Sequence, residues 1–190
     1  TEQFNVGIRS IELDIETIVS EDKVKFVCSH SPLIDMTSSC YDFELALEEI
    51  KMWSDANPRH LPISIIIEPK EFFLLENGMR FINLEYVNEL DKILREKFGD
   101  KLITPAEMMG DYDSLKEMRE NNGWMELEDC AGRVAVFFHD TDGVTGNYIK
   151  QDESIKTQAM FPMLRYRDRD KSYASVLIVN NPDDIEKYSA

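Results

Sequence analysis

The sequence predicts an α/β protein in which helices surround a parallel sheet or a barrel of parallel strands. Segments rich in β-branched and aromatic residues alternate along the chain with segments of helical periodicity. The segment "LPISIIIE" (61–68) is a continuous apolar run after a proline, which is typical of a strand buried on both faces. The length of 190 residues and the hydrophobic fraction of 43% suit a single domain with a sizeable core.

The first half of the chain is expected to supply three strands and one helix. The segments "VGIRSIELDI" (6–15) and "KVKFVCSH" (23–30) are predicted to be strands because β-branched and aromatic residues recur in them. The segment "FELALEEIKMW" (43–53) places Phe43, Leu47 and Ile50 on one face, which indicates a helix. The apolar run 61–68 is the third strand.

The second half continues the alternation. Apolar residues at helical spacing predict a helix from Leu84 to Phe98, and Gly99 ends it. Ser114 and Glu117 have the spacing of a capping box, which predicts the start of another helix. Three more strands are expected, a short one at 102–104 and two buried ones at 133–139 and 173–180. We interpret "DTDGVTGN" (140–147) as a glycine-containing loop and "RYRDRDK" (165–171) as a solvated connection.

The composition excludes several classes of protein. The formal net charge of −16 argues against nucleic-acid binding, which needs a basic surface, and gives no general attraction to anionic membranes. No apolar stretch approaches the roughly 20 residues of a membrane span. The opening "TEQFNVG" is expected to be folded-domain sequence and not a signal peptide. The acidic charge suits a protein that binds hard cations, although most of these acids are expected on solvated helix faces.

The three cysteines show no C-x-x-C spacing, so a zinc site is not expected. Cys28 and Cys40 are close enough in sequence to close a short loop by a disulfide in an exported protein. Three unpaired thiols, some of them buried, are the alternative, and the sequence does not decide between the two.

Two acids stand inside the first predicted strand. Glu12 and Asp14 are two residues apart and therefore point to the same face, while Ile11, Leu13 and Ile15 point to the other. The active site of a parallel α/β fold lies at the C-terminal ends of its strands. Glu12, Asp14, His30 and Glu68 all fall near such ends, so we expect them in one mouth. Glu68 is the strongest candidate, since an acid that ends the run "ISIII" must meet solvent or a partner.

Three carboxylates without converging cysteines predict a site for Ca²⁺ or, second, Mg²⁺. His30 would add a group that exchanges protons near neutral pH, and Lys70 would offer a positive charge to an anion. A cation, an imidazole and a lysine around one pocket indicate phosphoryl chemistry. His139 and Asp140 end a strand and are further candidates for the mouth. His60, in a proline-flanked turn, is expected to be structural.

The sequence also resembles a known family. The segments "GIRSIELDIE", "CSHSPLIDMTSSC" and "ALEEIKMWSDANPRHLPISIIIEPK" resemble the calcium-dependent phosphoinositide-specific phospholipase C-like proteins of the PLC-like phosphodiesterase superfamily. The resemblance continues through "LDKILREKFGDKLITPAEM", "SLKEMRENNGWMELEDCAGRVAVFF" and "VLIVNNPDD", so it covers nearly the whole chain. It implies a TIM-type (β/α) barrel and one phosphodiesterase catalytic domain over residues 1–190. Glycerophosphodiester phosphodiesterases share the E-x-D, the following histidine and the E-x-K; the W-S-D-A-N-P segment favours the phospholipase branch.

The resemblance also implies roles for individual residues. Glu12, Asp14 and Glu68 would be the metal ligands, with Ca²⁺ as the cofactor. His30 would be the general acid for the leaving alcohol, and Lys70 would contact the phosphate or the substrate. A substrate hydroxyl would attack phosphorus to give a cyclic phosphate. The substrate would be a phosphoinositide or related phosphodiester, reached by transient contact with a membrane surface, and the protein would be secreted, periplasmic or on the cell surface.

The sequence departs from the family pattern at both ends. The first of the family's two catalytic histidines, the general base, would precede Thr1, and a further strand with basic residues would follow Ala190. We therefore expect a barrel that is incomplete at both ends, and little or no activity from this chain alone. The alternatives are a glycerophosphodiester phosphodiesterase and a catalytically silent barrel that keeps an ion.

Overall fold

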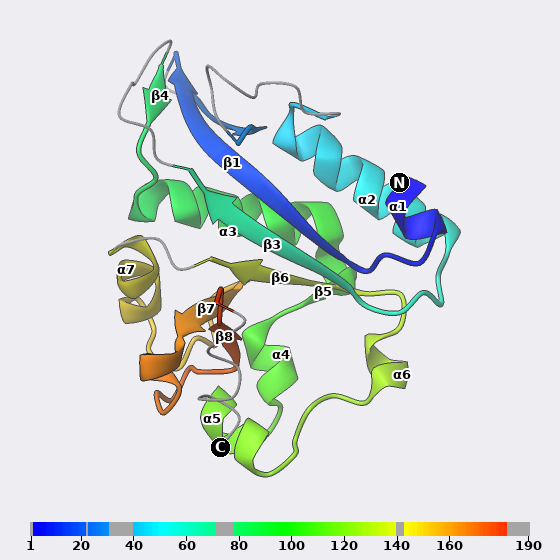
Figure 1. Cartoon of the computed structure of the whole chain (residues 1–190), viewed down its shortest axis with the longest axis vertical. Coiled ribbons are helices and arrows are strands. Elements are labelled where there is room, and N and C mark those ends of the chain that lie inside the picture. The colour runs from blue at the N-terminus through cyan, green and yellow to red at the C-terminus, as the bar shows by residue number, and fades with distance from the viewer. Residues whose placement is uncertain (1, 22, 31–39, 71–77, 140–142, 182–190) are drawn as a thin grey trace.

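A computed structural model describes residues 2–21, 23–30, 40–70, 78–139 and 143–181 (Figure 1). Strands and helices alternate along most of the chain, as predicted. Their order is α1 (Glu2–Asn5), β1 (Ser10–Ser20), β2 (Lys23–Cys28), α2 (Phe43–Ala56), β3 (Ile63–Pro69), β4 (Met79–Arg80), α3 (Leu84–Phe98), β5 (Leu102–Ile103), α4 (Pro105–Met109), α5 (Leu115–Glu120), α6 (Leu127–Cys130), β6 (Val134–Phe138), α7 (Val144–Lys150), β7 (Phe161–Arg165) and β8 (Val176–Ile178).

One sheet organises the molecule, with the strand order β2-β1-β3-β6-β7-β8. The pairs β1–β3, β3–β6, β6–β7 and β7–β8 are parallel, while β2 and β4 run antiparallel to β1 and β5 lies parallel to β6. Within the described residues this path ends at β2 and β8 without closing, so the structure is an open segment of a (β/α) barrel (Figure 1). The predicted fold class is confirmed in this form.

The first strand differs from its prediction in position. It was expected at 6–15, but β1 runs from Ser10 to Ser20, and a short helix, α1, precedes it. The residues after Asp14 continue the strand because they pair antiparallel with β2 from Ile15–Cys28 to Ser20–Lys23. Glu12 and Asp14 therefore lie within β1 and not at its end. They still reach the C-terminal edge of the parallel sheet, because β3 ends beside them.

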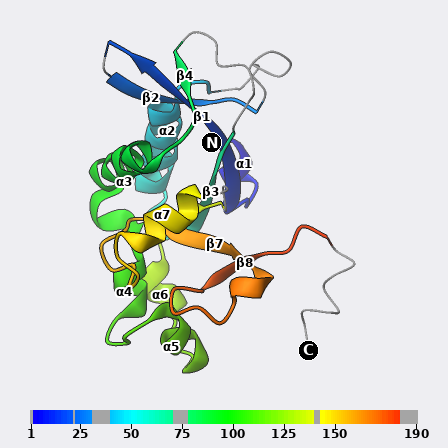
Figure 2. The same cartoon turned by 90° about the vertical axis from the view of Figure 1, so that its left-hand side faces the viewer.

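The two faces of the sheet have different environments. Ile63, Ile65 and Ile67 of β3 have no exposed surface and pack in one core with Leu47 of α2 and Leu90 of α3. Figures 1 and 2 show α2 and α3 side by side against the same strands. The alternate residues of β3, from Ser64 to Glu68, are only half-buried and face the interior of the open barrel. This face carries the candidate site.

The helices α2, α3 and α5 begin at the residue types that the sequence indicates. The side chains of Asp42, Asn83 and Ser114 each accept a hydrogen bond from the backbone three residues later. The capping box at Ser114 is shifted by one residue, since Glu117 Oε2 accepts from the backbone of Asp113 at 3.0 Å. The helix α3 ends at Gly99, whose φ of +51° lies in the left-handed region.

Two segments correct the sequence prediction. The helix α7 begins at Val144 and so occupies the second half of the segment that we interpreted as a loop, and Gly143 at φ +80° immediately precedes it. The strand β7 was not predicted, because Pro162 interrupts its apolar run; the strand is short, and its recorded pairs with β6 are Phe137–Phe161 and Phe138–Pro162. No helix of the described part is long and apolar enough to span a bilayer.

Candidate functional site

Two neighbouring parallel strands bring the three predicted carboxylates together. Asp14 of β1 is the direct ladder partner of Glu68 of β3, and Glu12 stands two residues earlier on the same face of β1. One oxygen from each carboxylate can be chosen so that all three lie within 4.8 Å of one another. The sequence signals, an E-x-D pair and an acid ending a buried run, thus identified residues that converge in space.

Lys70 completes this group. Its ammonium lies 2.9 Å from Glu68 Oε2 and 3.2 Å from Asp14 Oδ1. The backbone N–H of Lys70 donates to Ile15 at 2.8 Å, so the ladder continues past Pro69 and the side chain points to the same face as Glu68. In the described structure Lys70 is an internal cation that neutralises one of three negative charges.

The surroundings shift the pKa values of Glu12 and Glu68 in opposite directions. Burial and the neighbouring Glu68 and Asp14 raise the pKa of Glu12, and the opposing effects of Lys70 and His139 are smaller. Burial also acts to raise the pKa of Glu68, but its hydrogen bond and ion pair with Lys70 outweigh this and lower it. For Lys70, burial alone would lower the pKa, yet its bonds to Glu68 and Asp14 raise it. Glu12 is therefore the carboxylate whose charge is compensated least.

The donor set fits a hard divalent cation. All three side chains offer carboxylate oxygens, which suit Ca²⁺ and Mg²⁺, and nothing in the cluster offers sulfur. Glu12 is exposed and Asp14 and Glu68 are half-buried, so the group is open to an incoming ion on one side. Three carboxylates and one ammonium carry a net charge of about −2 when ionised, which a divalent ion would neutralise.

A fourth acid lies on the same face of β1 but in a different environment. Glu16 is only 4% exposed, and within the described residues neither carboxylate oxygen makes an aligned hydrogen bond. Burial raises the pKa of Glu16, and the nearby Ser29 hydroxyl opposes this only in part. Glu16 is not among the three grouped carboxylates, so it belongs to the interior beside the site and not to the ligand set.

His30 follows the end of β2 by two residues, and β2 pairs with β1, the strand that carries Glu12 and Asp14. The backbone N–H of Ser29 donates to the backbone carbonyl of Asp14 at 3.0 Å, which holds the residue before His30 beside β1. His30 itself is exposed. Its expected place in the mouth and its role as general acid both stay predictions.

The other sequence candidates have clear outcomes except one. His60 is buried and bonded to Ser54 Oγ and to the Leu61 carbonyl, far along β3 from Glu68, so the expected structural role agrees with its surroundings. His139 follows β6 and acts on the pKa of both Glu12 and Glu68, which places its ring at the mouth. Its signal in the sequence was its place at a strand end. Asp140 lies outside the described residues.

Of the two alternatives for Cys28 and Cys40, a disulfide or thiols, the structure contains the thiols. Cys28 and Cys40, both within the described residues, are not joined by a disulfide. Cys28 is buried, and burial, with smaller effects from Cys40, Asp42 and Asp14, raises its pKa to about 12. A thiol with such a pKa is a poor nucleophile at neutral pH, so Cys28 is a packing residue in this structure.

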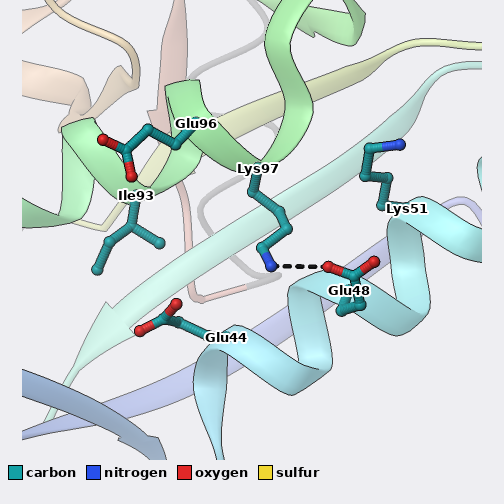
Figure 3. Close-up of a pocket in the computed structure, with 6 residues that line it drawn as sticks. All are labelled: Glu44, Glu48, Lys51, Ile93, Glu96 and Lys97. Carbon is teal, nitrogen blue, oxygen red and sulfur yellow. Dashed lines mark hydrogen bonds and ion pairs between the residues drawn. The ribbon is translucent and has the colours of Figure 1, made fainter.

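A pocket on the opposite face of the sheet is not part of this site. It lies between α2 and α3 and is lined by Glu44, Glu48, Lys51, Ile93, Glu96 and Lys97 (Figure 3). Lys97 donates to Glu48 at 2.7 Å across it. The hydrophobic core of β3 separates this pocket from the carboxylates, and its charges of both signs are those of a solvated helix surface.

Comparisons with known proteins agree with this fold. The family model "Phosphoinositide phospholipase C, Ca²⁺-dependent" matches residues 19–189. The structure is similar to a calcium-dependent phosphoinositol-specific phospholipase C from Pseudomonas sp., with TM-score 0.68 and 21% identity over 93% of this chain and 63% of that one. It is also similar to the Ca²⁺-dependent phosphatidylinositol-specific phospholipase C of Streptomyces antibioticus, with TM-score 0.69 and 21% identity over 93% and 67% of the two chains.

A myo-inositol complex of the Pseudomonas protein gives TM-score 0.66 at 21% identity over 90% of this chain and 61% of that one. The chain thus spans about two thirds of the length of these solved proteins. No curated protein sequence matches it.

Proposed function

We propose, because the chain belongs to the Ca²⁺-dependent phosphoinositide phospholipase C family, that it carries the ion-binding part of a phosphodiesterase that cleaves phosphoinositides. The observation that carries the proposal is the convergence of the Glu12, Asp14 and Glu68 carboxylates with the Lys70 ammonium at the C-terminal edge of the sheet. The family match names the ion as Ca²⁺, and the all-oxygen donor set suits it.

Each residue has a distinct part in the proposed reaction. Glu12, Asp14 and Glu68 would hold Ca²⁺, which when bound polarises a phosphoryl oxygen and stabilises the charge that develops there. Lys70 would keep a second positive charge beside the phosphate, since its pKa is raised by the two carboxylates that it contacts. His30 would give its proton to the departing alcohol while a substrate hydroxyl attacks phosphorus, so that the product is a cyclic phosphate.

The proposed location of the protein is outside the cytoplasm, as secreted, periplasmic or cell-surface material. Sites that work in extracellular Ca²⁺ bind at about 10⁻⁴–10⁻³ M, and the affinity of a Ca²⁺ site depends on the charge count of its ligands and on its rigidity. A site with three carboxylates and an internal lysine, which competes with the ion, fits this weak range.

The substrate class is tested by offering the full-length protein, and not this chain alone, phosphatidylinositol in vesicles and, separately, glycerophosphocholine, each with Ca²⁺ and with chelator. We expect Ca²⁺-dependent release of an inositol phosphate from the lipid. Preference for glycerophosphocholine would instead identify a glycerophosphodiester phosphodiesterase. Ca²⁺ binding without turnover of either substrate would identify a catalytically silent ion-binding barrel.

The proposed role of His30 has its own test in any form of the protein that turns over. A general acid typically contributes about 10²–10⁴ in rate, and its contribution depends on the leaving group. We expect His30→Ala to lose rate in this range on the lipid but much less on a nitrophenyl ester, whose leaving group needs no proton. Equal losses on the two substrates would show that His30 orients the phosphate and donates no proton.

A further inference from the structure

One row of residues crosses four neighbouring strands at the C-terminal edge of the sheet. Ser29 donates its backbone N–H to Asp14 on β1, and Asp14 is the ladder partner of Glu68 on β3. On the next strand Phe138 is the partner of Ile67, and the backbone N–H of His139 donates to Ile67 at 2.9 Å. His139 therefore continues β6 by one residue and lies beside Glu68, and residues neighbouring in this way direct their side chains to one face.

Two further observations place the imidazole of His139 in the mouth. Phe137, two residues earlier on the same face, packs its ring against Phe161 at 5.4 Å between ring centres, on the interior side of the open barrel. His139 also acts on the pKa of both Glu12 and Glu68, which agrees with a ring on the carboxylate side of the sheet. Thr145 Oγ1 also donates to the His139 carbonyl at 3.3 Å, which fixes the backbone that carries the ring.

The strand order puts His139 and His30 on opposite sides of the carboxylates. His30 follows β2, His139 follows β6, and the carboxylates lie on β1 and β3 between them. Three ionised carboxylates, the Lys70 ammonium and a divalent cation sum to about zero charge, so an anionic phosphodiester needs further hydrogen-bond donors. An imidazole carries an N–H donor in both its neutral and its protonated form.

We propose that His139 is a substrate-binding residue that donates a hydrogen bond to a non-bridging phosphate oxygen, from the β6 side of the site and opposite His30. This inference rests on the proposed function, because it takes the phosphodiester as the ligand. It adds a donor from a strand that supplies none of the candidate metal ligands. His139 acts in binding and orienting the phosphate; it is assigned no step of proton transfer.

The test is a calorimetric titration of the chain with myo-inositol 1-phosphate at saturating Ca²⁺. The variant His139→Phe keeps a planar ring without a donor, His139→Gln keeps an N–H donor, and Lys150→Gln is the control for a lost surface charge outside the mouth. A hydrogen bond to a charged group is worth about 10- to 100-fold in affinity. We expect His139→Phe to weaken binding by that factor, His139→Gln to recover part of it, and Lys150→Gln to change nothing.

Two further titrations separate the possible failures. Ca²⁺ alone should bind the wild type and His139→Phe with the same affinity, and inorganic phosphate should show the same loss in His139→Phe as inositol phosphate does. Unchanged phosphate binding in His139→Phe, or a parallel loss of Ca²⁺ affinity, would overturn the contact while the proposed function stands. Failure of the wild type to bind inositol phosphate would also overturn it. Failure of the wild type to bind Ca²⁺ would overturn the proposed function itself.

Discussion

The two ends of the parallel sheet both carry charged side chains, but only one end balances them. At the N-terminal end the Ser54 hydroxyl lies 2.8 Å from His60 Nε2 and accepts from Lys101 at 3.0 Å. His60 Nδ1 lies 2.6 Å from the Leu61 carbonyl, which assigns the proton to Nδ1 and makes Nε2 the acceptor. Lys101 also pairs with Asp55 at 3.0 Å. Every polar group of this network has a partner within it.

At the C-terminal end three carboxylates share one lysine. Burial, with Arg9 and Lys101 nearby, keeps the pKa of His60 low at the first end despite its bond to Leu61, so that network needs no ion. At the second end the pKa of Glu12 is raised by burial and by its like-charged neighbours. A ligand site is thus recognised by charge that the fold leaves uncompensated, and not by the number of polar residues that the fold brings together.

The sharpest test of the comparison removes one charge from the unbalanced end. Glu12→Gln keeps the shape of the side chain, and we expect Ca²⁺ affinity to fall about 100-fold, since affinity follows the number of charged ligands. Stability in chelator should stay the same or rise, because repulsion is relieved. Calorimetry and denaturation in chelator measure the two effects. Glu16→Gln, on the same face of β1, is the matched control and should bind Ca²⁺ normally; equal losses in both variants would contradict the ligand set.

The balanced end should respond in the opposite way. His60→Ala removes the bond between the imidazole and the Ser54 hydroxyl, which keeps Lys101 and the Gly132 carbonyl as partners, and removes a ring that packs 5.3 Å from Trp53. We expect the free energy of unfolding to fall by about 3 kcal/mol, from the lost packing and the lost hydrogen bond, with Ca²⁺ affinity unchanged. Urea denaturation in the presence of chelator measures this. A variant as stable as the wild type would show that the network is not structural.

The elements predicted best are those whose signal is local. The helix Leu84–Phe98 was predicted with its observed bounds, because its apolar spacing and Gly99 specify both face and end. The observed bounds of β3 differ from the predicted ones by only one or two residues, because an uninterrupted apolar run such as "ISIII" is stable only as a strand buried on both faces. The strands β1 and β7 were predicted poorly or missed, because antiparallel pairing with β2 extends the first, and parallel pairing places the second in the sheet despite Pro162.

The candidate site follows the same division. The convergence of Glu12, Asp14 and Glu68 could be predicted, since alternation within β1 and the end of β3 are properties of single segments. The place of His139 beside Glu68 could not be fixed, because it depends on which strand lies next to β3 in the sheet. The sequence also could not show that Lys70 bonds to two of the three acids, because Pro69 stands between it and Glu68.

A smaller effect is expected from removing the lysine that partly balances the C-terminal end. In Lys70→Met the ammonium that contacts Asp14 and Glu68 no longer competes with the ion. We expect Ca²⁺ affinity to rise about 5-fold and the stability in chelator to fall by about 1 kcal/mol, because the two acids lose their cation. Calorimetry and urea denaturation measure the pair of effects. Weaker Ca²⁺ binding in this variant would mean that Lys70 organises the ligands and does not compete with the ion.

The smallest expected effect is a difference in pH dependence between the ion-free and ion-bound states. The pKa of Glu12 in the folded protein lies above its ordinary value of 4.5, while that of Glu68 is lowered, so a falling pH protonates Glu12 first. Below pH 4.5 the ion-free folded state gains stability from this proton, and that stability is lost as the pH rises through the folded pKa.

The ion reverses this slope, because Ca²⁺ competes with the proton for Glu12. Between pH 7 and pH 5 we expect Ca²⁺ affinity to fall through Glu12 by a larger factor than a carboxyl of ordinary pKa would give, and the stabilisation by a fixed Ca²⁺ concentration to fall with it. Calorimetric titrations at several pH values measure the slope, and Glu12→Gln should flatten it together with the slope of stability in chelator. The balanced network at His60 should show no Ca²⁺-linked change. An affinity that stays level down to pH 4.5 would mean that Glu12 is not one of the ligands, and that Asp14 and Glu68 hold the ion without it.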